Sequence, residues 1–441
     1  MKEVKLSGRR EITMREENEG IRMILASDLC ISCGACVHIC VHRNIEMEFN
    51  RARGKWDACV RKPEVCQRCK GDSICLSVCP SYDVNYMELA ESQENGLLGR
   101  IKNVYNGYAK DPPLRFSSSS GGFIRVLCNT LYNKKEIDGA ITIMHDGGLE
   151  YSPRIVTNFR NMPNSIYHNI NFQNAIDLIK RNSGRYLLIG LPCQITGTEL
   201  FLRKNKDQHL RERIYAKISL LCGYTFDRKN IQAFANYYGF PLKEVSYRVG
   251  GRFRKTRLIN GSKTILIDAV HPGSLKDKIN NMIGFDQTMV QNACLFCVDH
   301  LCYCADLVVG DAWQRRYSED QLGTNIIISR TELGEEIVSK MNLFHFERGF
   351  KEEIVESQGE KYALGAIGEG MKRVKIKGHY FYPDRKRTDQ LQDIVTYPFH
   401  VKDMFKINII KPWLLRERFW MVKIIYLLFE WRTVVKESLR K

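Results

Sequence analysis

The sequence predicts an α/β core with a mostly parallel sheet, preceded by a small α+β domain rich in cysteine. Three observations predict this fold class. A chain of 441 residues exceeds the usual size of one domain, which is about 150 residues. Nine of its 16 cysteines fall between Cys30 and Cys79, and helical periodicity alternates with short apolar runs after about residue 100. We expect a polar tail over residues 1–20, a cysteine-rich domain over 21–90, an α/β domain over 91–375 and a basic extension over 376–441.

The composition excludes several classes of protein. A hydrophobic fraction of 44% and a charged fraction of 27% exclude global disorder. No apolar run reaches the roughly 18 residues of a membrane span, and the first 20 residues hold no apolar signal segment, so we expect a cytoplasmic protein. The net charge of +17 suits an acidic partner or an anionic cofactor as well as a solvated basic surface. Because the basic residues are spread along the chain without a known binding motif, we expect no nucleic acid partner.

Two cysteine runs in the N-terminal domain have the spacing of iron–sulfur ligands. Without an export signal, cysteines at this density indicate metal or redox chemistry rather than disulfides. The run from Cys30 to Cys40 has the pattern C-x2-C-x2-C-x3-C, and the run from Cys66 to Cys79 repeats it with three extra residues before its third cysteine. A zinc ribbon or treble clef also uses C-x2-C pairs, but three evenly spaced cysteines followed by a fourth are not typical of zinc. The two runs together resemble a bacterial dicluster ferredoxin.

The ferredoxin resemblance implies two 4Fe-4S clusters, because in that pattern the fourth cysteine of each run binds the cluster of the other run. Cys59 is a rival for the place of Cys75, which follows a long gap. Val41 replaces the proline that usually follows the fourth cysteine, and we expect His38 and His42 to be loop residues. The implied ligands are Cys30, Cys33, Cys36 and Cys79 for one cluster, and Cys66, Cys69, Cys75 and Cys40 for the other.

The middle of the chain alternates helical and strand patterns, as an α/β fold does. Cys193 and Cys222 each come just after an expected strand, at the sheet edge where open α/β folds bind ligands. The pair Cys294-x2-Cys297 would complete a set of four thiols, although a single buried cysteine is more often a small apolar residue. We expect helices over 122–132, 175–181 and 198–203, and strands over 139–144, 186–189 and 214–221.

Five strings occur in an order that resembles the beta subunit of coenzyme F420 hydrogenases and dehydrogenases. The resemblance covers about residues 100–345, and many members of that family carry an N-terminal dicluster ferredoxin. It implies FAD in the α/β domain and a third 4Fe-4S cluster held by Cys193, Cys222, Cys294 and Cys297. The strings are Ser120-Gly121-Gly122 before a helix, Gly190-Leu-Pro-Cys193-Gln194, Leu221-Cys222-Gly223, Cys294-x2-Cys297, and Ala305-Asp306 followed by Gly310-Asp311.

The serine-rich stretch before the first of these helices is the expected flavin site. Backbone N–H groups at a helix start attract a pyrophosphate, and glycine permits close approach. The alternative is a flexible serine loop with a helix cap. With the family resemblance, Ser120, Gly121 and Gly122 are the expected flavin contacts. The string Asn164–Tyr167 resembles a Gly-Ser-Lys-Tyr string of relatives, with Ile166 in place of the lysine.

The remaining cysteines and charges leave alternatives open. Cys302 and Cys304 are either alternative ligands or core residues, and Cys128 is expected to be buried and inert. The basic residues between Arg252 and Arg257 either attract an anionic substrate or protein, or form a solvated edge. The segment Phe419–Trp431 is apolar, aromatic and flanked by basic residues, so it either docks on protein or lies peripherally on the inner membrane face.

The sequence as a whole predicts an iron–sulfur flavoprotein oxidoreductase with an unidentified small-molecule substrate. Electrons would pass between a carrier such as ferredoxin, or a redox partner subunit, and the flavin. The alternative is an electron-transfer subunit that has no substrate site of its own and feeds a separate catalytic partner.

Overall fold

A computed structural model describes residues 20–358, apart from residues 27, 67–68, 70–72, 83, 91–97, 206, 238, 250–254, 269–289, 296 and 298. The polar tail over 1–19, Arg252, Arg254 and the expected extension over 376–441, with its segment Phe419–Trp431, lie outside the described residues. Within the described part of the chain, no helix has the length and apolar character needed to cross a membrane.

The N-terminal domain is built on a hairpin of β1 (Ile45–Asn50) and β2 (Lys55–Val60), which pair antiparallel. Its small core joins Ile24, Ile45 and Leu76 to the thiols of Cys36 and Cys79. This is the small α+β domain that the sequence predicts. The helices around the cysteine loops are α1 (Arg22–Ala26), α2 (Ala35–Ile39), α3 (Pro63–Cys66) and α4 (Tyr86–Leu89).

An eight-stranded sheet forms the centre of the molecule, in the order β13-β3-β12-β11-β7-β6-β4-β5. The adjacent strands β11, β7, β6 and β4 run parallel. On both sides of them the strands pair antiparallel. The α/β core is confirmed, with a sheet that is parallel at its centre and mixed overall. The strands are β3 (Asn103–Ala109), β4 (Gly139–Gly147), β5 (Glu150–Val156), β6 (Tyr186–Gly190), β7 (Ile214–Leu220), β11 (Leu307–Asp311), β12 (Asn325–Ser329) and β13 (Phe344–Gly349).

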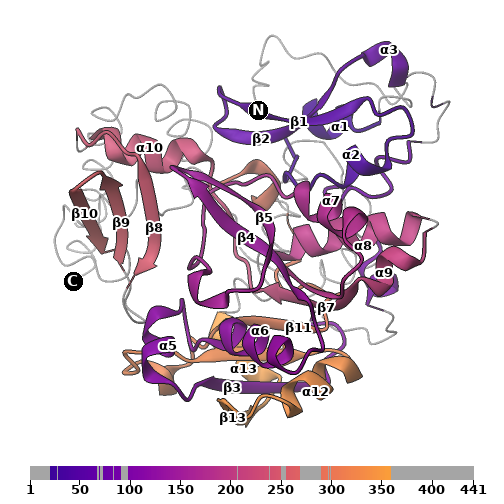
Figure 1. Cartoon of the computed structure of the whole chain (residues 1–441). Helices are drawn as coiled ribbons and strands as arrows, with labels where there is room; N and C mark the ends of the chain where they lie inside the picture. The colour runs from indigo at the N-terminus through magenta and orange to yellow at the C-terminus, as the bar shows by residue number, and fades with distance from the viewer. Residues whose placement is uncertain are drawn as a thin grey trace, which may run out of the picture.

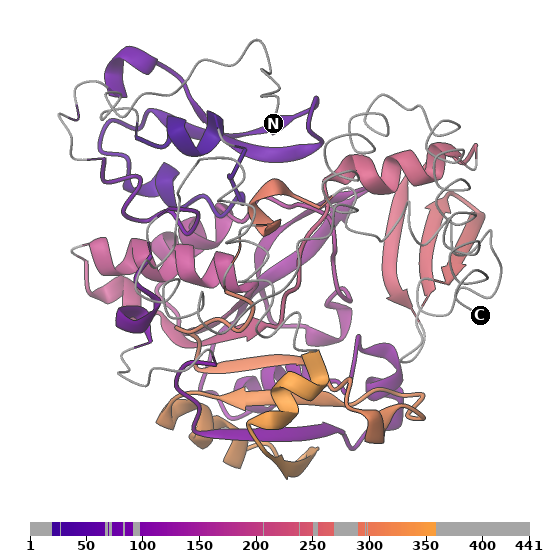
Figure 2. The same ribbon diagram turned by 180° about the vertical axis from the view of Figure 1, so that it is seen from behind.

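Helices cover both faces of this sheet, as Figures 1 and 2 show. On one face α6 buries Phe123 and Leu127 against strand residues such as Leu187, together with α12. On the other face α7 and α8 bury Ile176 and Phe201. The helices and 3-10 turns are α5 (Pro112–Ser117), α6 (Phe123–Asn133), η2 (Phe159–Asn161), α7 (Asn174–Arg181), α8 (Pro192–Lys204), α9 (His209–Glu212), α10 (Arg228–Tyr237), η4 (Asn292–Leu295), η5 (Arg315–Tyr317), α12 (Glu332–Ser339) and α13 (Glu352–Gln358).

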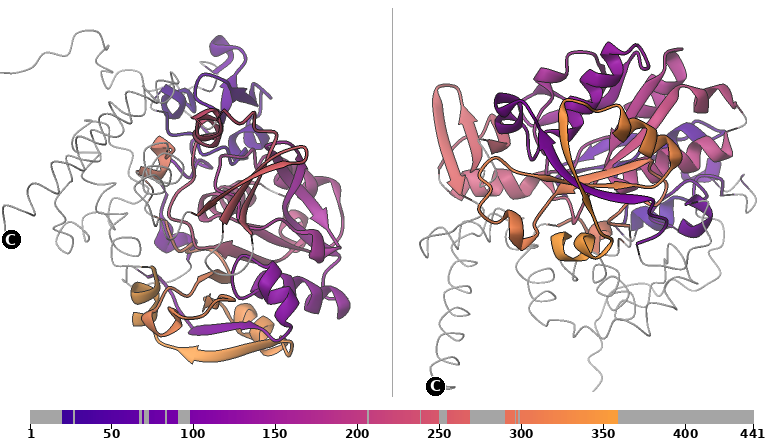
Figure 3. Two further views of the ribbon diagram at one scale, coloured as in Figure 1. Left: turned by 90° about the vertical axis from the view of Figure 1, so that its left-hand side faces the viewer. Right: turned by 90° about the horizontal axis from the view of Figure 1, so that it is seen from below.

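A second, three-stranded sheet lies to the side of the large one, as Figure 3 shows. It consists of β8 (Glu244–Val249), β9 (Lys255–Asn260) and β10 (Lys263–Asp268), paired antiparallel in the order β10-β9-β8. The expected basic hairpin is therefore present, with Arg257 on β9.

The N-terminal domain packs directly on the layer formed by α7 and α8 (Figure 1). Its residues Cys33, Val78 and Tyr86 belong to the same apolar core as Ile176 and Phe201. Gly197 of α8 permits this approach, because a Cβ there would lie 2.9 Å from the Cys33 Sγ atom. The two parts therefore share one core, and α4, which the sequence assigns to the N-terminal domain, also packs into it.

Candidate functional site

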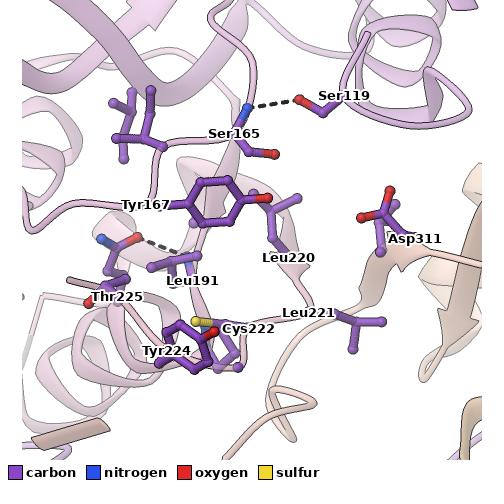
Figure 4. A pocket seen from close by; sticks show the side chains of 18 of the residues that line it. Ser119, Ser165, Tyr167, Leu191, Leu220, Leu221, Cys222, Tyr224, Thr225 and Asp311 are labelled. Carbon is purple, nitrogen blue, oxygen red and sulfur yellow. Dashed lines mark hydrogen bonds between the residues drawn. The ribbon is translucent and has the colours of Figure 1, made fainter. Parts of the chain in front are cut away.

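A cavity of about 1180 Å³ opens at the carboxyl ends of the parallel strands β6, β7 and β11. This is the edge at which open α/β sheets bind their ligands. The serine-rich loop before α6 and all four thiols of the expected third set line it, among them Cys193 and Cys222. Figure 4 shows Tyr167, Cys222 and Asp311 around one common space.

The loop before α6 is held in place by hydrogen bonds to two other segments. The Ser119 hydroxyl accepts a bond of 2.8 Å from the Ser165 backbone N–H, drawn in Figure 4, and the Ser120 hydroxyl donates to the Thr324 carbonyl at 2.9 Å. Gly122 takes a positive φ of 87° at the N-cap of α6, without a side-chain cap. Ser120 and Gly122 line the cavity, as the flavin prediction requires.

Gly121 does not line the cavity, and its tight packing gives the physical reason. A Cβ at this position would lie 2.5 Å from the Gly107 carbonyl oxygen and 2.8 Å from the Asn325 backbone nitrogen. The residue faces β3 and β12 rather than the cavity. Its glycine is thus explained by the close approach of two strands, and a flavin contact through Gly121 is not supported by its position.

Arg125 adds a positive charge to the same wall of the cavity. Its guanidinium donates to the hydroxyls of Ser117 and Ser118 and to the Met162 carbonyl. No described carboxylate forms an ion pair with it, and burial lowers its pKa. A half-buried arginine with polar but uncharged partners suits an anionic ligand group.

The opposite wall carries an ion pair and a stacked pair of tyrosines. Arg248 and Asp311 form a bidentate pair, in which the Nη2 to Oδ1 distance is 3.0 Å. Tyr167 packs edge-to-face on Tyr247, and the Tyr247 hydroxyl bonds to Nδ1 of the buried His168 at 2.9 Å. Burial, reinforced by the charge of a neighbouring arginine, lowers the pKa of His168 to about 3.

The four thiols of the expected third cluster come together from three segments. Cys193 lies in the first turn of α8, which begins at Pro192 and so earlier than the sequence pattern predicts. Cys222 follows β7, and Cys294 and Cys297 lie at η4 and just after it. Burial raises the pKa of all four thiols, and the charges of the others raise that of Cys193 further. Four buried thiols this close to one another are poor thiolates unless a cationic centre binds them.

The first ferredoxin-like set also converges as the sequence predicts. Burial raises the pKa of Cys33 to about 12 and that of Cys36 and Cys79 well above the usual range, with mutual repulsion among these thiols and Cys30 as a further cause. The Cys30 sulfur accepts a hydrogen bond of 3.4 Å from the Ala58 N–H. This set lies next to the third one, because Cys33 also acts on the charge of Cys193.

The second ferredoxin-like set lies farther out. Its thiols repel one another: Cys40 and Cys66 raise the pKa of both Cys69 and Cys75, after burial as the main cause. Asn44 links two of its loops by donating to the sulfurs of Cys40 at 3.3 Å and Cys66 at 3.5 Å, through its backbone and side-chain N–H groups respectively.

Cys59 stands apart from the second set. It lies on β2, and besides burial its pKa is raised by Glu48 and Glu46, with no cysteine among the causes. The geometry therefore favours Cys75 over Cys59 as the partner of the other three. His38 is not a loop residue as expected: it lies in α2 and bonds to the Gln173 carbonyl at 3.1 Å.

Lys55 is a buried cation between the first and third sets, and sequence reasoning did not identify it. Its ammonium is 1% exposed and lies 3.1 Å from the Cys30 carbonyl, 2.8 Å from Asp28 and 3.2 Å from Asp57. Burial opposes its charge, yet the two carboxylates raise its pKa above the usual value. Its charge lowers the pKa of both Cys30 and Cys294 against the effect of burial.

Within the described residues, no group of three or more His, Cys, Asp or Glu side chains is placed to hold one metal ion directly. A four-iron cube spaces its thiolates more widely than a single ion does. The donor set itself, four thiols per site, fits iron–sulfur clusters, which are held by four cysteine thiolates.

Comparisons with known proteins agree with the two parts of the chain. Residues 183–345 match the family described as the C terminus of the coenzyme F420 hydrogenase/dehydrogenase beta subunit. The chain is 24% identical over 326 residues to the F-type subunit of the F(420)H(2) dehydrogenase of Methanosarcina mazei, covering 71% of this chain and 83% of that protein. It is 22% identical over 331 residues to an uncharacterized protein of Methanocaldococcus jannaschii, covering 69% of this chain and 84% of that protein.

Two further matches concern the N-terminal domain and the fold. Over 60 residues the chain is 37% identical to a ferredoxin of Pyrobaculum islandicum, covering 13% of this chain and 47% of the ferredoxin. A chain of the F420-reducing NiFe hydrogenase complex from Methanosarcina barkeri aligns with a TM-score of 0.48 and 17% identity, covering 64% of this chain and 93% of that chain.

The protein thus joins a ferredoxin-like N-terminal domain to an α/β domain whose sheet edge carries a cavity lined with thiols. The family resemblance predicted from the sequence is confirmed. Over residues 183–345 the chain belongs to the family of coenzyme F420 hydrogenase/dehydrogenase beta subunits.

Proposed function

We propose that this protein is an iron–sulfur flavoprotein oxidoreductase. Two 4Fe-4S clusters would be held in the N-terminal domain, a third by Cys193, Cys222, Cys294 and Cys297, and FAD in the cavity. The single observation that carries the proposal is that one cavity is lined both by the serine-rich loop before α6 and by these four thiols. When bound there, FAD supplies the exchange between one-electron steps and a two-electron reaction with a small molecule.

The chain's own residues have separate parts in this proposal. Ser120 and Gly122 present hydroxyl and backbone donors to an anionic cofactor group, and Arg125 supplies its counter-charge. The bidentate pair of Arg248 and Asp311 fixes the opposite wall.

The order of the thiol sets suggests the direction of the electron path. The first set adjoins the third through Cys33 and Cys193, while the second set is closest to the exposed Val41, whose side chain is 71% exposed. An external carrier such as ferredoxin, or a redox partner subunit, would therefore exchange electrons at the second set. The first and third sets would connect it to the cavity.

A second candidate is an electron-transfer subunit without its own substrate site. The observation that favours it is that the first of the relatives above is itself named as one subunit of a dehydrogenase. Reduction of a small molecule by the isolated chain would separate the two candidates.

Anaerobic purification followed by iron, sulfide and flavin analysis tests the proposal. Three four-iron cubes require about 12 irons per chain. The variant Cys222→Ser should retain about eight, and the matched control Cys128→Ser, which changes a lone buried thiol in α6, should retain all of them. A colourless or zinc-loaded preparation of the unmodified protein would exclude the proposal.

A further inference from the structure

Cys302 and Cys304 form a buried thiol pair that belongs to none of the three sets. Their exposed fractions are 0% and 6%, and their thiols hydrogen-bond to each other. None of the main electrostatic influences on Cys193 or Cys222 comes from this pair. Of the two roles left open by the sequence, alternative ligand or plain core residue, neither accounts for two thiols in contact within a charged environment.

Two cations face this thiol pair. Arg330 is 1% exposed, donates to the backbone carbonyls of Leu98, Arg100 and Leu301, and forms no ion pair with any described carboxylate. Lys217 lies on the other side and pairs with Glu199 at 3.1 Å. Both cations act on the thiols of the pair, so the site favours negative charge on sulfur.

The two thiols differ in their protonation. The hydrogen bond from Cys302 lowers the pKa of Cys304, and the charge of Lys217 lowers it further against the effect of burial. Burial raises the pKa of Cys302. One thiolate in contact with one thiol is the arrangement from which a disulfide forms.

The pair lies next to the third thiol set. The Cys302 sulfur lies 4.0 Å from the carbonyl oxygen of Pro192, the residue before Cys193. The Asp299 carboxylate accepts a bond of 2.7 Å from the Cys302 N–H, and the Asp299 backbone carbonyl is 3.6 Å from the Cys297 sulfur. Because the pair is buried, soluble thiols cannot reach it, and its electrons must be exchanged within the protein.

We propose that Cys302 and Cys304 are a redox-active dithiol that exchanges two electrons with the centre held by the neighbouring third thiol set. In the oxidation, the Cys304 sulfur bonds to the Cys302 sulfur and Cys302 releases its proton. The two electrons leave one at a time to the oxidised cluster and from there to oxidised flavin. Reduction reverses these steps. The inference rests on the proposed iron–sulfur flavoprotein function, whose cofactors are the oxidant and the reductant.

The test counts electrons in the anaerobic holoprotein. Fully oxidised protein is titrated with dithionite, and the equivalents consumed are compared with those that its measured iron and flavin content requires. The pair should add two equivalents per chain. This excess should be lost in Cys302→Ser and in Cys304→Ser, and retained in the matched control Cys128→Ser, which changes a lone buried thiol.

Mass spectrometry of the unmodified protein gives a second readout that needs no variant. Samples poised at successive potentials are quenched in acid, unfolded and alkylated with N-ethylmaleimide. The peptide with residues 302–304 should be unlabelled in the oxidised sample and doubly labelled in the reduced one, while Cys128 is labelled in both. A protein with about 12 irons whose pair is doubly labelled at every potential overturns this inference and leaves the proposed function standing. A protein without iron and flavin overturns the proposed function and this inference with it.

Discussion

Gly197 tests the contact between the ferredoxin-like domain and the α/β domain. It lies inside α8, and a Cβ at this position would lie 2.9 Å from the Cys33 Sγ atom and 3.2 Å from Pro80 Cγ. Ordinary contacts of a Cβ begin at 3.4 Å. The variant Gly197→Ala therefore needs the Cys33 loop and α8 to separate by about half an ångström, which in a well-packed core costs about 1–3 kcal/mol.

Helix propensity acts in the opposite direction, since alanine is favoured over glycine by about 1 kcal/mol inside a helix. The expected net loss is about 0–2 kcal/mol, and in domains of 150–250 residues each kcal/mol lowers the melting temperature by about 2–4 °C. The displacement is centred on Cys33, a ligand in the proposed first cluster, so we also expect a lower iron content.

Circular dichroism melting and iron analysis of anaerobic Gly197→Ala protein measure these effects. Lys204→Ala is the control, because Lys204 is an exposed residue in the last turn of the same helix. It should change stability by less than about 0.5 kcal/mol. A Gly197→Ala protein that melts at a higher temperature than the original and keeps its full iron content would refute the close contact.

Three further predictions concern buried charges. Lys55→Met leaves its carboxylate partners buried without a counter-charge, so urea unfolding should show a loss of about 3–5 kcal/mol, part of which returns in the double variant Lys55→Met/Asp57→Asn. The folded-state pKa of His168, lowered from 6.5 to about 3, means that the unfolded chain binds the proton first, so this group's stabilisation is full above pH 6.5 and is lost as the pH falls toward 3; melting temperatures between pH 7 and pH 4 should fall less steeply in His168→Leu, and equal slopes would contradict the assignment. Arg125→Leu should weaken flavin retention by about tenfold to a hundredfold, the equivalent of one charge-assisted hydrogen bond, while Arg181→Leu on the exposed side of α7 should leave it unchanged; equal retention measured by equilibrium dialysis would remove Arg125 from the site.

The sequence predicts the features that short-range spacing determines. The two cysteine runs place their thiols in the expected sets because the loops between them are short. Cys193 and Cys222 meet because parallel strands end at the same edge of a sheet. In the same way, the apolar spacing of α6 predicts which of its residues face the sheet.

Long-range pairing is what the sequence does not determine. β3 lies between β12 and β13, more than 200 residues later in the chain, and no local pattern specifies this antiparallel pairing. Lys55 is equally invisible, because its charge acquires meaning only when Asp28 and Cys294 are brought beside it. Gly121 looks like a phosphate-loop glycine in sequence, whereas its reason in the structure is the neighbouring backbone of β3 and β12.

The joint between the two domains is itself built as a specific polar network. Asn169, which is 3% exposed, accepts a bond of 2.8 Å from the Trp56 N–H and donates to the Ser32 hydroxyl at 2.7 Å and to Gln291 at 3.0 Å. Ser32 adjoins Cys33, and Gln291 begins the turn that carries Cys294. One buried side chain therefore fixes the loop of the first thiol set against that of the third. Since a buried amide with a missing partner is costly, the network favours a single relative position of the two loops. Redox centres held in these loops would then keep a constant separation while a substrate or carrier comes and goes.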